Sequence, residues 1–326
     1  MLRGITLQRL LFGSVAILLS TLASAQSFPT KTVRILIPYP AASGPDLIMR
    51  AIIPHMSEML GQPVIIENKG GGGGVPAVLD LLNAPADGYT LLAADSSQWA
   101  IYPAAKPDAP YDAVRDFLAI SRVYTSNLAF FVNATSPIKD MRELIAAAKA
   151  NPGKLRYGVT GIASIMHLTG AAFSTGANVN TIAIPYRASA ETVAAVLRGD
   201  IDYGVSGWQS VTAQVKAGKL RALGLSTLMG IEDAPGMRSV ADAAGIAGFN
   251  YGVEYGVLGR AGTPKPVIEK LSASINKAMV MPDIVKQGKS QSFDMNPITP
   301  EQFGEIIRND VKRYAQLAKA ASIKAD

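Results

Sequence analysis

The chain of 326 residues contains no cysteine and only two histidines, His55 and His167. Without cysteine it can form neither a disulfide framework nor a thiolate metal site. Two histidines are too few for a typical transition-metal centre. An exported protein of this size without disulfides fits a bacterial periplasm better than a small disulfide-rich extracellular domain does. We therefore expect no bound metal and no cofactor.

Signatures of nucleotide binding and of serine hydrolysis are also missing. The glycine run Gly70–Gly74 fails the G-x-G-x-x-G spacing, and no G-x-x-x-x-G-K sequence is present. The stretch Gly204–Trp208 is close to a nucleophile elbow, but tryptophan stands where G-x-S-x-G requires its last glycine. We expect a protein that is not an enzyme and has no catalytic residues, with an exported hydrolase as the less favoured alternative.

Long apolar runs are absent beyond the N-terminus, where no later segment approaches the ~18 residues of a membrane span. At the N-terminus Arg3 and Arg9 precede the apolar stretch Leu10–Leu22, and Ala23–Ala25 matches an A-x-A cleavage site. This pattern predicts that residues 1–25 are a signal peptide, with an N-terminal anchor as the alternative. The mature protein is then soluble and located in the periplasm.

The excess of charge is small. The chain has 31 Lys and Arg against 25 Asp and Glu, and removal of Arg3 and Arg9 leaves 29 − 25 = +4. The basic residues of the last predicted helix are typical of a solvated helix face rather than a nucleic-acid surface. We expect no nucleic-acid partner, whereas a modest positive surplus suits an anionic small ligand.

Short apolar runs alternate with helical segments along the mature chain, which predicts an α/β fold built from βαβ units with mostly parallel sheets. About 300 residues usually form two domains or lobes. Ligands of such folds bind outside the carboxyl ends of the strands. The loops at those ends are residues 38–45, 95–99, 160–164, 185–189 and 206–209.

The first of these loops is the most informative part of the sequence. The strand Thr32–Ile37 leads into the small residues Ala41–Gly44, and Pro45 and Asp46 then open a helix. Exposed main-chain N–H groups at the positive end of a helix form a binding place for an anion. Asp46 either caps this helix, which is the usual role of a carboxylate there, or contacts the ligand directly.

A second loop repeats this pattern in the middle of the chain. Tyr157–Ser164 is again a strand, then small residues, then a helix start, so the two halves of the chain should face each other across a ligand. His167 lies one turn further and either lines this loop or packs within its helix. The only tryptophans, Trp99 and Trp208, fall in predicted ligand loops, where they stack on a ligand or pack in the core.

These stretches together resemble the periplasmic solute receptors of tripartite tricarboxylate transporters, the Bug receptor family. The segments that carry the resemblance are Pro29–Asp46, Leu60–Asn68 with the glycine run, Asp87–Leu92, Tyr111–Phe117, Gly161–Leu168, Ile184–Tyr186 and Ala217–Leu223. The first loop departs from the Gly-Gly-Gly-Thr-Asp that is usual in the family, and Tyr186-Arg187-Ala188-Ser189 replaces the usual Tyr-Lys-Gly.

The resemblance implies a two-lobed periplasmic binding protein of type II-like architecture, joined by two crossover segments. Residues 26–124 with 226–326 would form lobe 1, and residues 125–225 lobe 2. It implies a solute-binding protein that captures a small organic carboxylate, aromatic or aliphatic, for membrane transporter subunits. We expect a monomer, with an orphan receptor used for sensing as the alternative.

The residues expected to bind the ligand come from the loops of both lobes. They are Tyr39, Ala41, Ala42, Ser43, Gly44, Asp46, Ser96, Ser97, Gln98, Trp99, Thr160, Ser164, His167, Tyr186 and Trp208.

Overall fold

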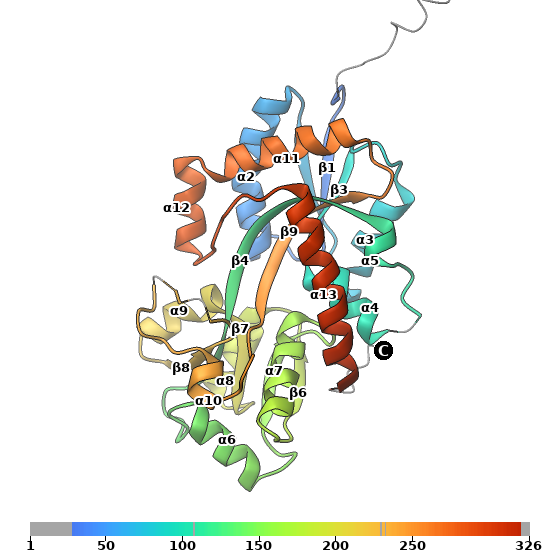
Figure 1. Ribbon diagram of the computed structural model, residues 1–326. Helices are drawn as coiled ribbons and strands as arrows, with labels where there is room; N and C mark the ends of the chain where they lie inside the picture. Colours follow the sequence, from blue (N-terminus) through green and yellow to red (C-terminus); the bar gives the residue numbers. More distant parts are fainter. Residues whose placement is uncertain (1–27, 107, 229, 232, 321–326) are drawn as a thin grey trace, which may run out of the picture.

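The computed structural model describes residues 28–320 except 107, 229 and 232, so the predicted signal peptide lies outside the described residues. The chain forms two α/β lobes, one above the other in Figure 1. In the upper lobe β1 (Val33–Ile37) pairs in parallel with β2 (Val64–Asn68) and with β3 (Thr90–Asp95). Helices α2 (Gly44–Leu60) and α3 (Val75–Asn83) connect these strands, as the predicted βαβ units require.

Local sequence explains where α2 begins and ends. Pro45 occupies the first turn, where its missing N–H costs no hydrogen bond. Gly61 ends the helix in the left-handed conformation, with φ of 69°, and its N–H closes the last turn onto Ser57. The helix therefore presents its N-terminus to the loop that the sequence predicted as a binding place.

The second lobe is built in the same way. Strand β5 (Arg156–Thr160) pairs in parallel with β6 (Ile182–Tyr186) and β7 (Tyr203–Gly207). The remaining elements of this lobe are α6 (Met141–Ala150), α7 (Ile165–Gly176), α8 (Ser189–Arg198), α9 (Trp208–Lys216), β8 (Leu220–Leu225) and α10 (Val240–Ala244).

Two long strands join the lobes. Strand β4 has 17 residues, Phe117–Asn133; it pairs with β9 (Gly252–Arg260) as far as Asn127 and then with β7 and β8. The sequence alone predicts two separate strands here, Phe117–Val123 and Leu128–Val132, whereas the structure has one continuous strand that crosses between the lobes. Every strand pair that includes β4 or β9 is antiparallel, and the remaining pairs, within each lobe, are parallel. The nine-stranded sheet as a whole is therefore mixed.

The C-terminal part of the chain covers the upper lobe and the junction. Helices α11 (Lys265–Met279) and α12 (Pro282–Ser290) pack on α2, and α13 (Pro300–Ala320) runs down towards α7 of the lower lobe. A capping box starts α13, because Thr299 and Gln302 exchange side-chain to backbone hydrogen bonds. Short helical segments complete the upper lobe: η1 (Gly72–Gly74), η2 (Ser97–Ile101), α4 (Tyr102–Ala105) and α5 (Ala113–Asp116).

The boundary between the lobes differs from the predicted one after β8. Helix α10 lies beyond residue 225, yet it packs on α6 and β8 of the lower lobe, and Val240 is fully buried there. Phe249 packs edge-on against Phe130 of β4. The chain therefore returns to the upper lobe along β9 rather than at residue 226.

Candidate functional site

The loop between β1 and α2 has a backbone conformation that its own carboxylate maintains. Ala42 adopts φ of 62°, a left-handed conformation that costs a non-glycine residue about 1–2 kcal/mol. Its N–H donates to Oδ2 of Asp46 at 2.8 Å, four residues along the chain. Ala41 and Ala42 are exposed, and Ser43 is the N-cap residue of α2.

Asp46 is fully buried and its oxygens are used within the protein. Besides Ala42, it accepts hydrogen bonds from Arg50 Nε at 2.8 Å and from Asn68 Nδ2 at 2.9 Å. Burial alone would raise the pKa of Asp46, but these three hydrogen bonds outweigh it and lower the pKa. Asp46 therefore stays ionised and shapes the loop. This agrees with the expectation that Asp46 serves the start of the helix rather than contacting the ligand directly.

The loop between β5 and α7 repeats this geometry in the lower lobe. Ala163 also has a left-handed conformation, with φ of 55°, and Ser164 is the N-cap of α7. The N–H of Ala163 donates to Nδ1 of His167 at 3.2 Å, again four residues along the chain. The resemblance between the two loops in the sequence is thus a resemblance of backbone conformation as well.

The two loops differ in what their polar side chains leave free. Ser164 Oγ accepts from the N–H of His167 and donates to the carbonyl of Gly161, whereas Ser43 Oγ is buried without a hydrogen-bond partner among the described residues. Burial lowers the pKa of His167, so its ring is neutral near pH 7. Because Nδ1 accepts a hydrogen bond, the proton is on Nε2, which makes Nε2 a donor.

Each loop lies close to the opposite lobe. The N–H of Ile165, the first residue of α7, donates to Oγ of Ser97 in the upper lobe at 3.2 Å. On the other side, a Cβ at Gly44 would lie 3.7 Å from Nε2 of Gln209 in the lower lobe. The structure therefore brings the predicted loops of the two lobes together.

The loop after β3 is held by a buried polar cluster. Tyr39 donates its hydroxyl to Asp95, and Gln98 Oε1 accepts from the N–H of Asp95 and lies 3.2 Å from the same hydroxyl. Burial raises the pKa of Asp95, while burial and the nearby Asp95 carboxylate raise that of Tyr39. Tyr39 and Gln98 thus connect the loop after β1 with the loop after β3 and hold both in place, and Ser96 in the second of these loops is fully buried.

Both tryptophans are buried, although they belong to predicted ligand loops. Trp99 is fully buried; its Nε1 donates to Asp310 at 3.1 Å and its ring packs edge-on against Phe303 of α13. Trp208 is 2% exposed and belongs to the core of the lower lobe. Of the two alternatives given for the tryptophans, their burial agrees with packing in the core, because the large apolar rings are used there.

The remaining predicted residues lie at the ends of the lower-lobe strands. Thr160 Oγ1 is 3.3 Å from Oγ of Ser189 at the start of α8. Tyr186 ends β6, is half-buried and packs against the core of the lower lobe. These two residues are close to the second loop, and their ligand contact stays a prediction.

Two glutamines near the first loop were missed. A Cβ at Gly44 would lie 3.4 Å from Oε1 of Gln291, which follows α12, as well as near Gln209. Gln209 Oε1 and Gln291 Nε2 are buried atoms without a hydrogen-bond partner in the part of the chain that the structure describes. Gln209 falls in the predicted loop 206–209, but nothing in the sequence pointed to Gln291.

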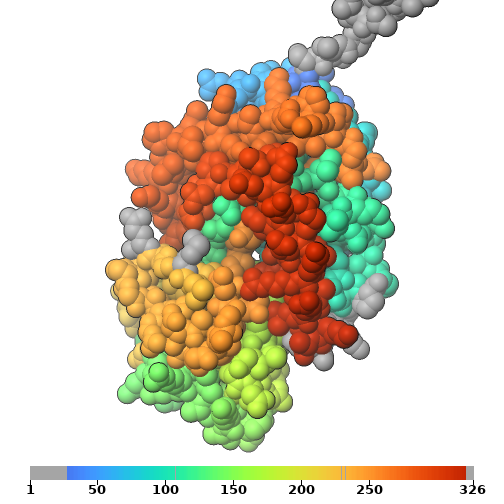
Figure 2. Space-filling model, in the orientation of Figure 1, coloured from blue at the N-terminus to red at the C-terminus, as the bar shows by residue number. Residues whose placement is uncertain are grey.

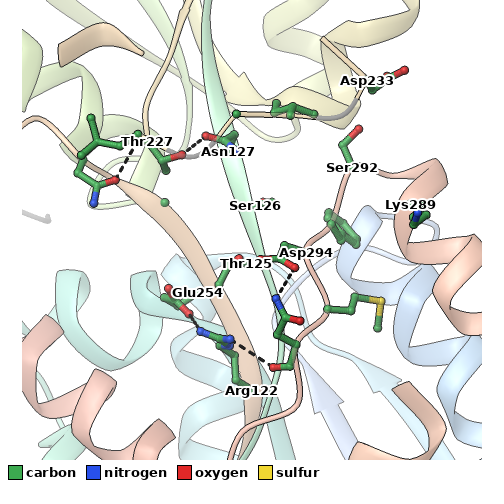
Figure 3. Close-up of a pocket in the computed structure, with 18 of the residues that line it drawn as sticks. Arg122, Thr125, Ser126, Asn127, Thr227, Asp233, Glu254, Lys289, Ser292 and Asp294 are labelled. Carbon is green, nitrogen blue, oxygen red and sulfur yellow. Dashed lines mark hydrogen bonds and ion pairs between the residues drawn. The ribbon is translucent and has the colours of Figure 1, made fainter. Parts of the chain in front are cut away.

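A cavity of about 1120 Å³ lies beside the strands that join the lobes. In the space-filling view the surface is hollowed between the orange C-terminal segments and the yellow part of the lower lobe (Figure 2). Thr125–Asn127 of β4 and Glu254 of β9 line it, and Arg122 faces Glu254 with 3.5 Å between nitrogen and oxygen (Figure 3). None of the predicted ligand residues is among those that line this cavity.

No group of three or more histidines, cysteines or acidic residues in residues 28–320, as far as they are described, could hold a metal ion. No helix among these residues is long and apolar enough to cross a membrane. The groups that the two loops and their neighbours present are main-chain, hydroxyl, carboxamide and imidazole groups.

Comparison with known proteins gives consistent matches along the chain. Residues 48–323 match the model of the tripartite tricarboxylate transporter family receptor. A protein from Pseudomonas sp. strain P51, encoded between tcbD and tcbE, is 31% identical over 97% of this chain and 95% of its own length. The structure of the periplasmic binding protein BugD is 26% identical with a TM-score of 0.82, covering 92% of this chain and 100% of BugD.

A more distant solved structure has the same fold. Rpa4515 of R. palustris, solved with adipate, is 23% identical with a TM-score of 0.83 and covers 91% of this chain and 99% of its own. These matches confirm the two-lobed fold of periplasmic binding proteins, and members of the matched family are solute receptors rather than enzymes. The chain belongs to the receptor family of the tripartite tricarboxylate transporters, whose members are periplasmic solute receptors.

Proposed function

We propose that this protein captures a small organic carboxylate between its two lobes and delivers it to the membrane subunits of a tripartite transporter. The observation that carries the proposal is the pair of matching loops, in which Ala42-Ser43 and Ala163-Ser164 each lead into a helix N-terminus. Helix N-termini favour anions, because their free N–H groups and the helix dipole point outwards. The closeness of each loop to the opposite lobe supports a ligand held from both sides.

The electrostatics of the site suit a carboxylate. The negative charge of Asp46 is matched by Arg50 and by two further hydrogen bonds, so little of it acts on a ligand. His167 is neutral and offers a donor. The binding of adipate by Rpa4515 supports the same class of ligand. Because both tryptophans are in the cores, indole stacking does not favour an aromatic over an aliphatic carboxylate.

The ligand itself can be found by mass spectrometry of small molecules released from the natively purified protein. We expect a carboxylate at about one molecule per protein, and calorimetry with aliphatic and aromatic carboxylates should then rank the class. Purified protein from which no carboxylate is released, and to which none binds in calorimetry, would contradict the proposal.

Export and assembly can be tested on the same preparation. We propose cleavage after Ala25, a periplasmic location and a monomeric protein. N-terminal sequencing of the exported protein should begin at Gln26, and light scattering should give the mass of a single chain. Incubation with the ligand should leave it unchanged; a steady conversion that His167→Ala abolishes would show an enzyme instead.

A further inference from the structure

We propose that Ser97 is a positioning residue that holds the two lobes closed around the ligand without touching the ligand itself. Its hydroxyl oxygen accepts a hydrogen bond at 3.2 Å from the N–H of Ile165, so a side chain of the upper lobe is bonded to the main chain of the lower lobe. Ser97 begins η2 and Ile165 begins α7. This inference rests on the proposed function, because it concerns how the lobes close on the proposed carboxylate.

Ser97 is fixed to the first ligand loop through a buried carboxylate. Its N–H donates to Oδ1 of Asp95 at 2.7 Å, and Tyr39 donates its hydroxyl to Oδ2 of the same side chain. Burial raises the pKa of Asp95, whereas hydrogen bonds from Tyr39 and from the side chain and main chain of Ser97 lower it. Asp95 therefore ties Ser97 to the loop between β1 and α2.

Ile165 is fixed to the second ligand loop by the chain itself, because it directly follows Ser164, the N-cap residue of α7. The N–H groups in the first turn of an α-helix have no partner within the helix. Ser164 Oγ accepts from the N–H of His167, and Ser97 Oγ accepts from the N–H of Ile165. The first turn of α7 is thus capped both from its own lobe and from the opposite lobe.

The hydrogen bond lies where the lobes pack directly on each other. Ile165 is fully buried and Ser97 is 7% exposed, so water is excluded from the bond. Helix α7 packs on η2 and on α13, both of the upper lobe. Beside β4 and β9, by contrast, the cavity described above is lined from both lobes. Separation of the lobes would therefore expose groups on the α7 side that are now dry.

Opening of the ligand site must break this hydrogen bond. A ligand enters only when the loop that contains Tyr39 moves away from the loop that ends at Ser164. Ser97 moves with the first loop and Ile165 with the second, so the two atoms separate. In a protein that is mostly open without ligand, a bond made only in the closed state strengthens the binding of every ligand by the same factor. A residue that contacts the ligand instead favours some ligands over others.

The first test is calorimetry with a panel of aliphatic and aromatic carboxylates. Ser97→Ala should weaken the binding of every acid by one common factor of about two- to tenfold, which is what one hydrogen bond supplies. Ser97→Cys, whose thiol is a weak acceptor, serves as a second variant if Ser97→Ala does not fold. Ser274→Ala is the matched control: Ser274 is 4% exposed, its hydroxyl donates to Leu271 within α11, and its loss should leave all affinities unchanged.

The second test is amide hydrogen exchange followed by nuclear magnetic resonance, which reports on the bond itself. In the wild type, saturation with the tightest-binding acid should slow the exchange of the Ile165 N–H by at least about tenfold, because the open form that exposes it is depleted. The slowing should be clearly smaller in Ser97→Ala. The N–H of Asp242, which Ser239 caps within the lower lobe, is the internal control and should exchange at the same rate with and without ligand.

The outcomes separate this inference from the proposed function. If Ser97→Ala leaves all affinities unchanged, or weakens the binding of some acids and not of others, the inference is overturned while the proposed function stands. The same holds if ligand does not slow exchange at Ile165. If no acid binds to the wild type, the proposed function itself fails.

Discussion

Glu254 should make the protein less stable as the pH rises through neutrality. Its carboxyl lies on β9 beside Arg122 of β4 (Figure 3). Burial raises its pKa to about 7 from an ordinary value of 4.5; Arg122 lowers it, while Asp310 and Asp294 raise it further. The folded protein therefore holds a proton on Glu254 between about pH 4.5 and 7, where the unfolded chain has released it.

The sign and size of the effect follow from proton linkage. Because the folded state binds more protons than the unfolded state in this range, the free energy of unfolding falls as the pH rises. The pKa difference at 1.36 kcal/mol per unit corresponds to about 3 kcal/mol. The Glu254 side chain is 24% exposed, and water reduces the effect, so we expect a loss of about 2–3 kcal/mol between pH 4.5 and 8.

The measurement compares the wild type with Glu254→Gln, which resembles the protonated side chain at every pH. Guanidinium unfolding at a series of pH values should show that the free energy of unfolding of the variant rises relative to that of the wild type as the pH rises from 4.5 to 8. Glu58→Gln, at an exposed position on α2, serves as the control and should show no such trend. A difference between Glu254→Gln and the wild type that does not change with pH would refute the reasoning.

Three further predictions concern the loops and the tryptophans. If main-chain donors supply most of the affinity, Ala42→Leu should weaken ligand binding in calorimetry far more than Ser43→Ala, since each hydrogen bond to a charged group contributes about 1.5–3 kcal/mol. Ala150→Leu is the exposed control, and a larger loss of affinity from Ser43→Ala would contradict the idea. Trp99→Phe removes the N–H that donates to Asp310, so the free energy of unfolding should fall by about 1–3 kcal/mol. Because burial raises the pKa of Asp310 to about 6, the unpaired carboxylate is charged at pH 8, and the loss should be larger there than at pH 5. Equal losses at both pH values would oppose this. Because Trp99 and Trp208 are both buried, the emission maximum of intrinsic fluorescence should shift little on ligand binding, and a large blue shift would show that an indole leaves water.

Alternating apolar runs and helix starts predicted most elements and the two matching loops, because these depend on residues near one another in the sequence. The continuity of β4 was not predicted, since the polar stretch Thr125–Asn127 resembles a break; only its pairing with β9, far along the chain, keeps it extended. The burial of Trp99 depends on Phe303 of α13, about 200 residues away, which no local pattern reveals. Gln291 was missed for the same reason, because its position near Gly44 comes from the packing of α12 on α2.

The shared strand β4 has a mechanical consequence for the movement of the lobes. At the junction Thr125, Ser126 and Asn127 pair with Glu254, Val253 and Gly252, so the connection is a hydrogen-bonded two-stranded ribbon. Such ribbons resist stretching and in-plane bending but vary widely in twist without losing their ladder. Opening and closing should therefore be a torsion about the ribbon axis that breaks no backbone hydrogen bond there, which allows exchange on the microsecond to millisecond timescale of domain motions.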